Sequence, residues 1–317
     1  MMDLFAAVII DWIIGDPHWF SHPVIYIGKL ISYLEKKGRK LCKKDNTLKA
    51  FGGLIVVIVG AVSFFIPFTA LVFLRKHVIL YQIINIFIIW TTISAKCLAV
   101  EAKKVYYALK KEDIEDARLK LSYIVGRDTS NLKSEEIVRA DVETVAENTS
   151  DGVIAPLIYA AVFGAPFAML YKGINTMDSM LGYMNEKYRF IGFFPAKVDD
   201  IFNFIPSRIT GVLMCMSSFM VRGNPIKAFK IMIRDRKNHK SPNCAYPEAA
   251  AAGAMGIQLG GTNIYFGEVV YKPTIGDKLM ELNFEHIRYC INLMYFTEIL
   301  MVILWGIIFI VLSLDWM

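Results

Sequence analysis

The stretch that decides the fold is FGGLIVVIVGAVSFFIPFTALVFL, which covers residues 51–74 without a charged side chain. A helix needs about 20 apolar residues to cross the hydrocarbon core of a bilayer, and this run exceeds that length. Further runs without a charge cover 78–95, 153–171 and 299–314. Buried strands are only about 4–8 residues long, which disfavours a soluble three-layer fold. The sequence therefore predicts an all-α, polytopic integral membrane protein.

The composition of the 317 residues supports this class. Hydrophobic residues make up 55% and charged residues 20%, against about 45–50% and about 25% in soluble domains. This excludes an intrinsically disordered chain. The five cysteines form no C-x-x-C pair, so neither a zinc site nor a disulfide framework is indicated. No basic residue precedes the first apolar stretch, which is unlike a secretory signal peptide.

Charge patterning predicts the topology. The segment 32–50 is rich in lysine, and by the positive-inside rule it is cytoplasmic; its place beside a membrane-length run disfavours nucleic-acid binding. We expect 51–74 and 78–100 to form a helical hairpin around the turn 75–77. A single membrane-embedded domain, 1–317, is predicted, with about four to six membrane helices. Its helical cytoplasmic segments are 15–50, 101–152 and 222–292.

Two apolar segments leave alternatives open. Residues 153–171 contain Gly164 between two prolines, and residues 201–221 contain Arg208 and a proline. If both segments span the membrane, 172–200 lies outside; if both are re-entrant or buried against other helices, 172–200 lies inside. The number of spans and the oligomeric state also stay open.

Several polar motifs exceed what a membrane anchor needs. A helix starting with Ser134 as its N-cap would place Glu143, Glu147 and Asp151 in one row. Such a row is either a solvated acidic face or a site for a cation such as Mg²⁺, which prefers oxygen ligands. The turn 15–23 holds one carboxylate and two imidazoles, from His18 and His22. Its Asp-Pro and His-Pro pairs disfavour helix before each proline.

Further candidates follow along the chain. Asn175 and Asp178 share one motif, and the pair Asp199-Asp200 leads into the apolar segment that contains Arg208. An arginine inside an apolar run needs a partner, and these aspartates or a substrate phosphate are the candidates. The loop 234–243 groups Arg and Lys with Ser and Asn, which suits phosphate or carboxylate binding. It also fits an ordinary positive-inside loop. No P-loop, nucleophile elbow or His-Glu-x-x-His motif occurs.

Six motifs occur in one order along most of the chain. They are Gly-Asp-Pro…His-Pro-Val-x-x-Ile-Gly over 15–28, Glu-Asn-x-x-Asp-Gly-Val-x-Ala-Pro over 147–156, Asn-Thr-x-Asp-Ser-Met-x-Gly-Tyr over 175–183, Asp-Asp…Ile-Pro-Ser-Arg over 199–208, Ser-Pro-Asn…Pro-Glu-Ala over 241–249 and Gln-Leu-Gly-Gly over 258–261. Each motif alone is weak, but the ordered set resembles the CobD/CbiB family of cobalamin biosynthesis.

The resemblance implies an adenosylcobinamide-phosphate synthase, a ligase that forms a C–N bond. Such an enzyme joins the free propionate of the corrinoid adenosylcobyric acid to (R)-1-amino-2-propanol O-2-phosphate, or to the free amino alcohol. The resemblance also implies ATP as co-substrate and Mg²⁺ as metal, with no tightly bound cofactor. It implies a multi-pass protein of the inner cell membrane with a cytoplasmic active face. Expected partners are the two substrates, the lipid bilayer and other cobalamin-pathway enzymes, but no nucleic acid.

The chemistry of this reaction suggests roles for the candidate residues. A carboxylate must be activated before an amine can attack it, and phosphate transfer from ATP would do so. We expect Mg²⁺ ligands at Asp151, Asp178, Asp199 and Asp200. We expect substrate and phosphate binding by Arg208, Arg234, Arg236, Lys237, Ser241, Asn243 and Asn175. Candidates to take the proton from the attacking amine are Glu147, His22 and His239. The alternative function is a membrane carrier or a scaffold for corrinoid intermediates.

Overall fold

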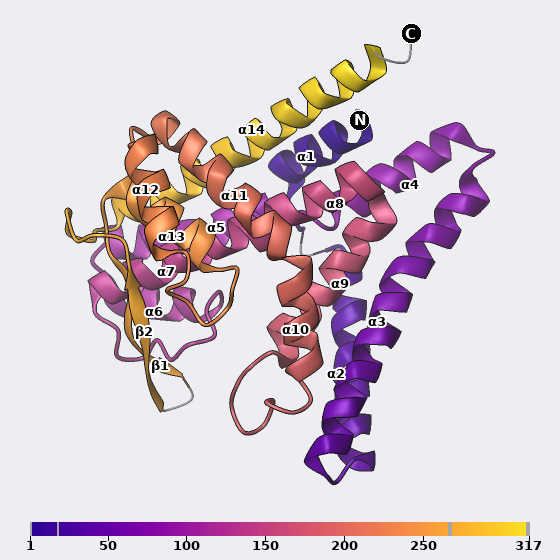
Figure 1. Ribbon diagram of the computed structural model, residues 1–317, viewed down its shortest axis with the longest axis horizontal. Coiled ribbons are helices and arrows are strands. Elements are labelled where there is room, and N and C mark those ends of the chain that lie inside the picture. Colours follow the sequence, from indigo (N-terminus) through magenta and orange to yellow (C-terminus); the bar gives the residue numbers. More distant parts are fainter. Residues whose placement is uncertain (1, 18, 266–267, 315–317) are drawn as a thin grey trace. The chain divides into compact units, whose positions relative to one another are not determined.

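The computed structural model describes residues 2–17, 19–265 and 268–314. His18 of the first motif lies outside the described residues. Contacts along the chain divide it into two compact units, Met1–Ser94 with Ala155–Asn203, and Ala95–Ile154 with Phe204–Met317. Both units are built mainly of helices (Figure 1). The expectation of a single domain over 1–317 stays a prediction.

The first unit is entirely helical in its regular structure over the residues that are described. Its helices are α1 (Met2–Ile14), α2 (Pro23–Leu41), α3 (Asp45–Leu74), α4 (Val78–Trp90), α8 (Ala155–Phe163), α9 (Ala165–Leu181) and α10 (Phe193–Phe202). The helices α3 and α4 form the expected hairpin, and α2 and α9 pack beside α3 (Figure 1). The contact between α3 and α9 is close: a Cβ on Gly173 would lie 2.3 Å from Ser63 Oγ.

The start of α2 follows the chemistry of its sequence. Pro23 is the first residue of the helix, where its missing N–H costs nothing. His22 is the N-cap, and its Nδ1 accepts a hydrogen bond from Val24 N at 3.2 Å. The prediction that the His-Pro pair marks a helix boundary is confirmed.

The apolar run 153–171 does not form one helix. Gly164 separates α8 from α9 with a φ of 89°, a value that only glycine adopts at little cost. Pro166 follows in the first turn of α9, where proline is tolerated. The segment 172–200, which was expected to be a loop, contains the end of α9, through Leu181, and the start of α10, from Phe193. The expected loop is therefore largely helical.

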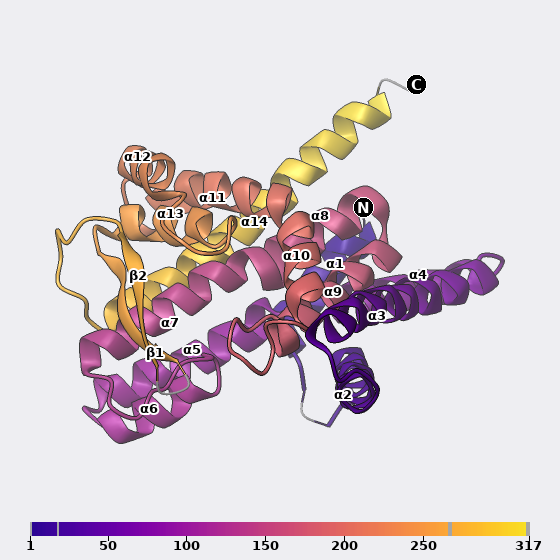
Figure 2. The same ribbon diagram turned by 60° about the horizontal axis from the view of Figure 1, so that its bottom comes forward.

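The second unit combines helices with one small sheet. Its elements are α5 (Ala95–Lys110), α6 (Ile114–Ser122), α7 (Ser134–Asn148), η1 (Thr149–Ile154), α11 (Phe204–Ser217), η2 (Ser218–Val221), α12 (Pro225–Asp235), α13 (Ala245–Met255), β1 (Leu259–Tyr265), β2 (Glu268–Ile275) and α14 (Glu285–Leu314). Every residue of α13 except the half-buried Tyr246 is buried, and the helix packs beside α12 (Figure 2). A Cβ on Gly253 would lie 2.8 Å from Ala228 Cα, so α13 needs small residues at this contact.

The hairpin of β1 and β2 was not expected from the sequence. The two strands pair antiparallel, with an irregularity between Leu259 and Gly261. Gly260 has a φ of 81°, and a Cβ there would lie 2.3 Å from Pro273 O. The two glycines of β1 obscure the strand pattern in the sequence, because glycine is depleted in strands. The close backbone approach, by contrast, agrees with the small residues of this motif.

Four helical segments in the described part of the chain are long and apolar enough to cross a membrane. They are Asp45–Leu74, Val78–Lys110, Phe204–Val221 and Glu285–Leu314. The prediction of a helical membrane protein with about four to six such segments is confirmed. Residues 201–221 contribute one of them, whereas 153–171 do not, because Gly164 interrupts the helix.

Candidate active site

The acidic helix α7 is the first element of the candidate site in the second unit. It begins at Ser134, as expected, but Lys133 is the N-cap, and its backbone N–H donates to Glu136 Oε2 at 2.8 Å. The following segment, η1, is a π-helix. A π-helix has a wider turn than an α-helix and is frequent at functional sites. Asp151 therefore does not continue the row of Glu143 and Glu147 at regular α-helical spacing, which corrects the sequence-based expectation.

Glu143 is held in a buried ion pair. Its Oε2 accepts a hydrogen bond from Arg127 Nη2 at 2.5 Å, and its Oε1 accepts one from Gly260 N at 2.8 Å. Burial by itself would raise the pKa of Glu143, but the positive charges of Arg127 and Lys272 and these hydrogen bonds hold that pKa below its usual value. Glu143 is thus a charged group that ties α7 to β1.

Glu147, one turn later on α7, faces the start of α13. The Cys244 thiol donates to Glu147 Oε1 at 3.0 Å. Glu248 lies one turn beyond Cys244 and is 2% exposed, and its Oε1 has no hydrogen-bond partner among the described residues. Burial, followed by the negative charges of Glu143 and Glu147, raises the pKa of Glu248 well above its usual value. The pKa values of two neighbouring carboxyl groups of this cluster, Glu143 and Glu248, are therefore shifted in opposite directions.

The two candidate histidines share one feature, a δ nitrogen that accepts a backbone hydrogen bond. His239 Nδ1 accepts from Ser241 N at 3.0 Å, as His22 Nδ1 does from Val24 N. In a neutral ring this leaves the proton on Nε2, so Nε2 is a donor. Burial and the positive charge of Lys272 lower the pKa of His239. The negative charges of Glu147 and Glu143 oppose this shift but do not cancel it. This geometry favours Glu147 over either histidine as the proton acceptor.

Arg208 meets the loop 241–243 within the second unit. Its Nη1 donates to Asn243 Oδ1 at 3.1 Å, and Asn243 N donates to Ser241 Oγ at 3.2 Å. The guanidinium also lies over the rings of Phe204 and Tyr246, 3.5 and 4.4 Å from their centroids. Two motifs that are far apart in sequence are thereby brought together.

Within the second unit, the hydrogen bonds of Arg208 go to neutral acceptors: the side chains of Asn243 and Ser207 and the carbonyls of Phe204 and Pro242. The expectation of an aspartate or a substrate phosphate as its partner stays a prediction. Neutral acceptors orient the guanidinium without cancelling its charge, so it remains suited to an anion.

The other predicted phosphate-binding cations are placed differently. Arg234 Nε donates to Asp235 Oδ1 at 2.7 Å, and its Nη1 lies 2.9 Å from Asp277 Oδ1. These bonds raise the pKa of Arg234, and its charge is compensated. Arg236 donates to the carbonyl of Ile233 at the end of α12. Lys237 follows it and is exposed. Of the four predicted cations, Arg208 is thus the one placed against Ser241 and Asn243.

In the first unit, α9 and α10 bring two predicted motifs together. Asn175 Nδ2 donates to Asp199 Oδ1 at 3.4 Å, and Asn203 Nδ2 donates to Asp199 Oδ2 at 3.0 Å. The Tyr171 hydroxyl donates to Asn203 Oδ1 at 2.7 Å. Asp200 lies 3.4 Å from Lys197 Nζ. Asp199 is thus a buried carboxylate fixed by amide groups.

Two further predicted residues lie in this unit. Asp178 is half-buried on α9, and a Cβ on Gly182 would lie 1.9 Å from Asp178 Oδ1, so this carboxylate rests against the glycine. His22 Nε2 lies 3.7 Å from Asp16 Oδ1. Burial lowers the pKa of His22, while Asp16 opposes that shift.

The comparisons with known proteins agree on one family. The family model described as "CobD/Cbib protein" matches residues 4–294. The chain belongs to the CobD/CbiB family. It is 66% identical over 308 residues to the cobalamin biosynthesis protein CobD of Clostridium acetobutylicum, covering 97% of this chain and 98% of that protein. It is 44% identical over 290 residues to the cobalamin biosynthesis protein CbiB of Salmonella typhimurium, covering 91% of each. No solved structure matches the chain significantly.

For this CobD/CbiB chain, the predicted metal ligands divide between the units. Asp178, Asp199 and Asp200 lie in the first unit and Asp151 in the second. Within the described residues, no group of three or more His, Cys, Asp and Glu side chains is arranged to hold a metal ion. Mg²⁺ usually takes only one or two protein carboxylates and completes its shell with water and substrate phosphates. The assignment of these aspartates as Mg²⁺ ligands stays a prediction.

Sequence reasoning gave no site role to three charged members of the cluster in this CobD/CbiB chain: Arg127, Lys272 and Glu248, the last of which stands in the motif over 241–249. Glu248 had a detectable signal, because it is the one acidic residue in the small, apolar sequence of α13 and such a carboxylate is rarely buried without a role. Arg127 and Lys272 had no comparable signal, since each lies in an ordinary polar segment and reaches the cluster only through folding.

Proposed function

We propose that this protein is the adenosylcobinamide-phosphate synthase of cobalamin biosynthesis. It would form an amide between the free propionate of adenosylcobyric acid and (R)-1-amino-2-propanol O-2-phosphate or the unphosphorylated amino alcohol, with ATP as the source of energy. Family membership gives the chain its role in cobalamin biosynthesis. The observation that carries the proposed reaction is the arrangement of Arg208, Ser241 and Asn243, which presents a cation and small polar groups suited to phosphate.

The proposed reaction has two steps. A propionate oxygen attacks the γ-phosphorus of ATP, ADP leaves, and an acyl phosphate forms. The amine nitrogen then attacks the carbonyl carbon, inorganic phosphate leaves, and the amide forms. Arg208 would bind the transferred phosphoryl group, and Arg236 and Lys237 would add positive charge. Arg234 has a lesser role, since Asp235 and Asp277 compensate it.

The attacking amine must lose a proton, because an ammonium group has no lone pair. Glu147 would accept this proton, since both histidines use Nδ1 to accept backbone hydrogen bonds. Asp151, Asp178, Asp199 and Asp200 would supply ligands to Mg²⁺, which neutralises phosphate charge when bound. Asn175 would orient Asp199 through their hydrogen bond.

The proposed location is the inner cell membrane, with the reaction at the cytoplasmic face where ATP is available. The lysine-rich segment 32–50, just before the apolar part of α3, supports this orientation by the positive-inside rule. A cysteine placed at Asn185, in the loop between α9 and α10, tests it. Labelling from the cytoplasmic side is expected, and labelling only from the outside would remove Asp178 from the site.

The deciding experiment is an assay of the detergent-solubilised protein with adenosylcobyric acid, aminopropanol phosphate, ATP and Mg²⁺. Mass spectrometry should detect the amide product together with ADP. Tight corrinoid binding without product would instead favour the carrier or scaffold. An Arg208→Gln variant should lose most turnover, whereas Lys230→Gln, which removes an exposed cation from α12, should retain it.

A further inference from the structure

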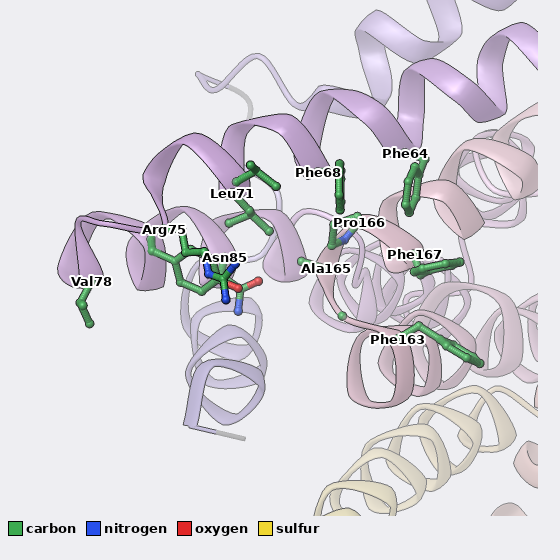
Figure 3. Close-up of a pocket in the computed structure, with 13 residues that line it drawn as sticks. Phe64, Phe68, Leu71, Arg75, Val78, Asn85, Phe163, Ala165, Pro166 and Phe167 are labelled. Carbon is green, nitrogen blue, oxygen red and sulfur yellow. The ribbon is translucent and has the colours of Figure 1, made fainter.

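A pocket of the first unit lies between the α3–α4 hairpin and the α8–α9 break (Figure 3). Its volume is about 530 Å³. One side is a phenylalanine wall made of Phe64 and Phe68 from α3, Phe163 from α8 and Phe167 from α9. The four rings form a row in which each ring packs against the next. The centroid distances are 5.5 Å for Phe68–Phe64, 5.0 Å for Phe64–Phe167 and 5.3 Å for Phe167–Phe163. The wall is therefore a continuous apolar surface.

The rim of the pocket is polar. Among the lining residues that the structure describes, Arg75 is the one with a formal charge, and Tyr81 and Asn85 are its polar companions. Asn85 Nδ2 is already used, because it donates to Asp3 Oδ2 at 2.7 Å. No carboxylate lines the pocket beside Arg75 within the described residues. The pocket thus joins an apolar wall to a single lining cation, while the Asp3 carboxylate lies behind Asn85.

The depth of the pocket matches one leaflet of a bilayer. Arg75 directly follows the membrane-length helix α3, and Phe64 lies eleven residues earlier on it. At a rise of about 1.5 Å per residue, this separation is about 16 Å. Half of a hydrocarbon core is about 15 Å. Arg75 therefore lies at headgroup depth when Phe64 lies near the bilayer midplane, on the side away from the lysine-rich segment 32–50.

We propose that this pocket binds one anionic phospholipid, with the lipid phosphate at Arg75 and an acyl chain along the phenylalanine wall. An anionic headgroup is favoured because Arg75 is the one charged side chain that lines the described part of the pocket, and it lies at headgroup depth. A free phosphate ion would leave the phenylalanine wall unused. A lipid without a phosphate, such as diacylglycerol, would leave the charge of Arg75 without a partner. This site is separate from the proposed synthase residues, so the two proposals stand or fall independently.

The test is native mass spectrometry of the full-length protein in detergent, titrated with phosphatidylglycerol or with diacylglycerol of the same chains. One phosphatidylglycerol should be retained selectively. The variant Arg75→Gln should weaken that binding about fivefold, as expected for one cation at a membrane surface. Lys76→Gln is the matched control, since Lys76 occupies the same turn but does not line the pocket, and it should change binding by less than about twofold.

A second pair of variants tests the apolar half. Phe68→Ala should weaken retention, whereas Phe73→Ala, on the same helix but outside the pocket and 84% exposed, should not. The proposal is overturned if Arg75→Gln and Lys76→Gln act alike, or if diacylglycerol is retained as well as phosphatidylglycerol. It is also overturned if inorganic phosphate alone displaces the lipid, because the pocket would then recognise a free anion.

Discussion

Removing Arg127 from its pair with Glu143 should destabilise the second unit strongly. The side chains of Arg127 and Glu143 are only 6% and 3% exposed, and their closest atoms are 2.5 Å apart. The variant Arg127→Met leaves the Glu143 carboxylate buried with Gly260 N as its remaining hydrogen-bond donor among the bonds described above. Breaking a buried ion pair on one side costs about 3–5 kcal/mol, because the remaining charge cannot recover its hydration.

The double variant Arg127→Met/Glu143→Leu should be less unstable than the single one. It removes both charges and leaves mainly Gly260 N without its acceptor, which costs about 1–3 kcal/mol. The pKa of Glu143 is lowered in the folded protein. The ion pair therefore stabilises the fold at pH values above the pKa that Glu143 has in the unfolded chain. That stability is lost as the pH falls through the folded-state pKa. In Arg127→Met the buried Glu143 carboxyl has lost its cation, so burial raises its pKa and protonation relieves part of the cost at pH 5. The cost of Arg127→Met should be larger at pH 8 than at pH 5 for this reason.

The free energy of unfolding can be measured by chemical denaturation in mixed detergent micelles at both pH values. Glu135→Gln is the control, because Glu135 is an exposed carboxylate on the same helix; its effect should stay within about 0.5 kcal/mol. If Arg127→Met at pH 8 costs no more than this control, the buried pair does not stabilise the fold as argued.

Three further predictions concern the candidate site. Arg208→Lys should lower kcat/KM of the proposed synthase at least about tenfold, since a point charge cannot replace a planar guanidinium; equal kinetics would contradict phosphate binding there. Acidification through the lowered pKa of His239 removes the acceptor for Ser241 N, so activity should fall on the acidic side of the ordinary histidine range. His239→Asn, which keeps an acceptor, should flatten that part of the pH profile. Because the pKa of Glu248 is raised by burial, its contribution to stability falls as the pH rises above the unfolded-state pKa; Glu248→Gln should therefore be relatively more stable at pH 8 than at pH 5, compared with the wild type in thermal unfolding.

Some of the candidate site was accessible from sequence and some was not. The pairing of Asn175 with Asp199, and of Arg208 with Asn243, joins residues that had each been selected by their motif. Arg234 was selected on the same chemical grounds, yet Asp235 and Asp277 compensate its charge. Residue type indicates what a side chain can bind, whereas its neighbours decide whether that capacity is already used.

The sequence by itself determined the membrane class, the helix start at Pro23 and the family. These features depend on local properties: the length of an apolar run, the missing N–H of proline, and the order of motifs along the chain. Only the tertiary structure decided that Gly260 N binds Glu143, that Glu248 is buried beside the acidic helix, and that Arg208 has neutral partners. Each of these contacts joins residues far apart in sequence, and their energies depend on burial, which arises only when the helices pack.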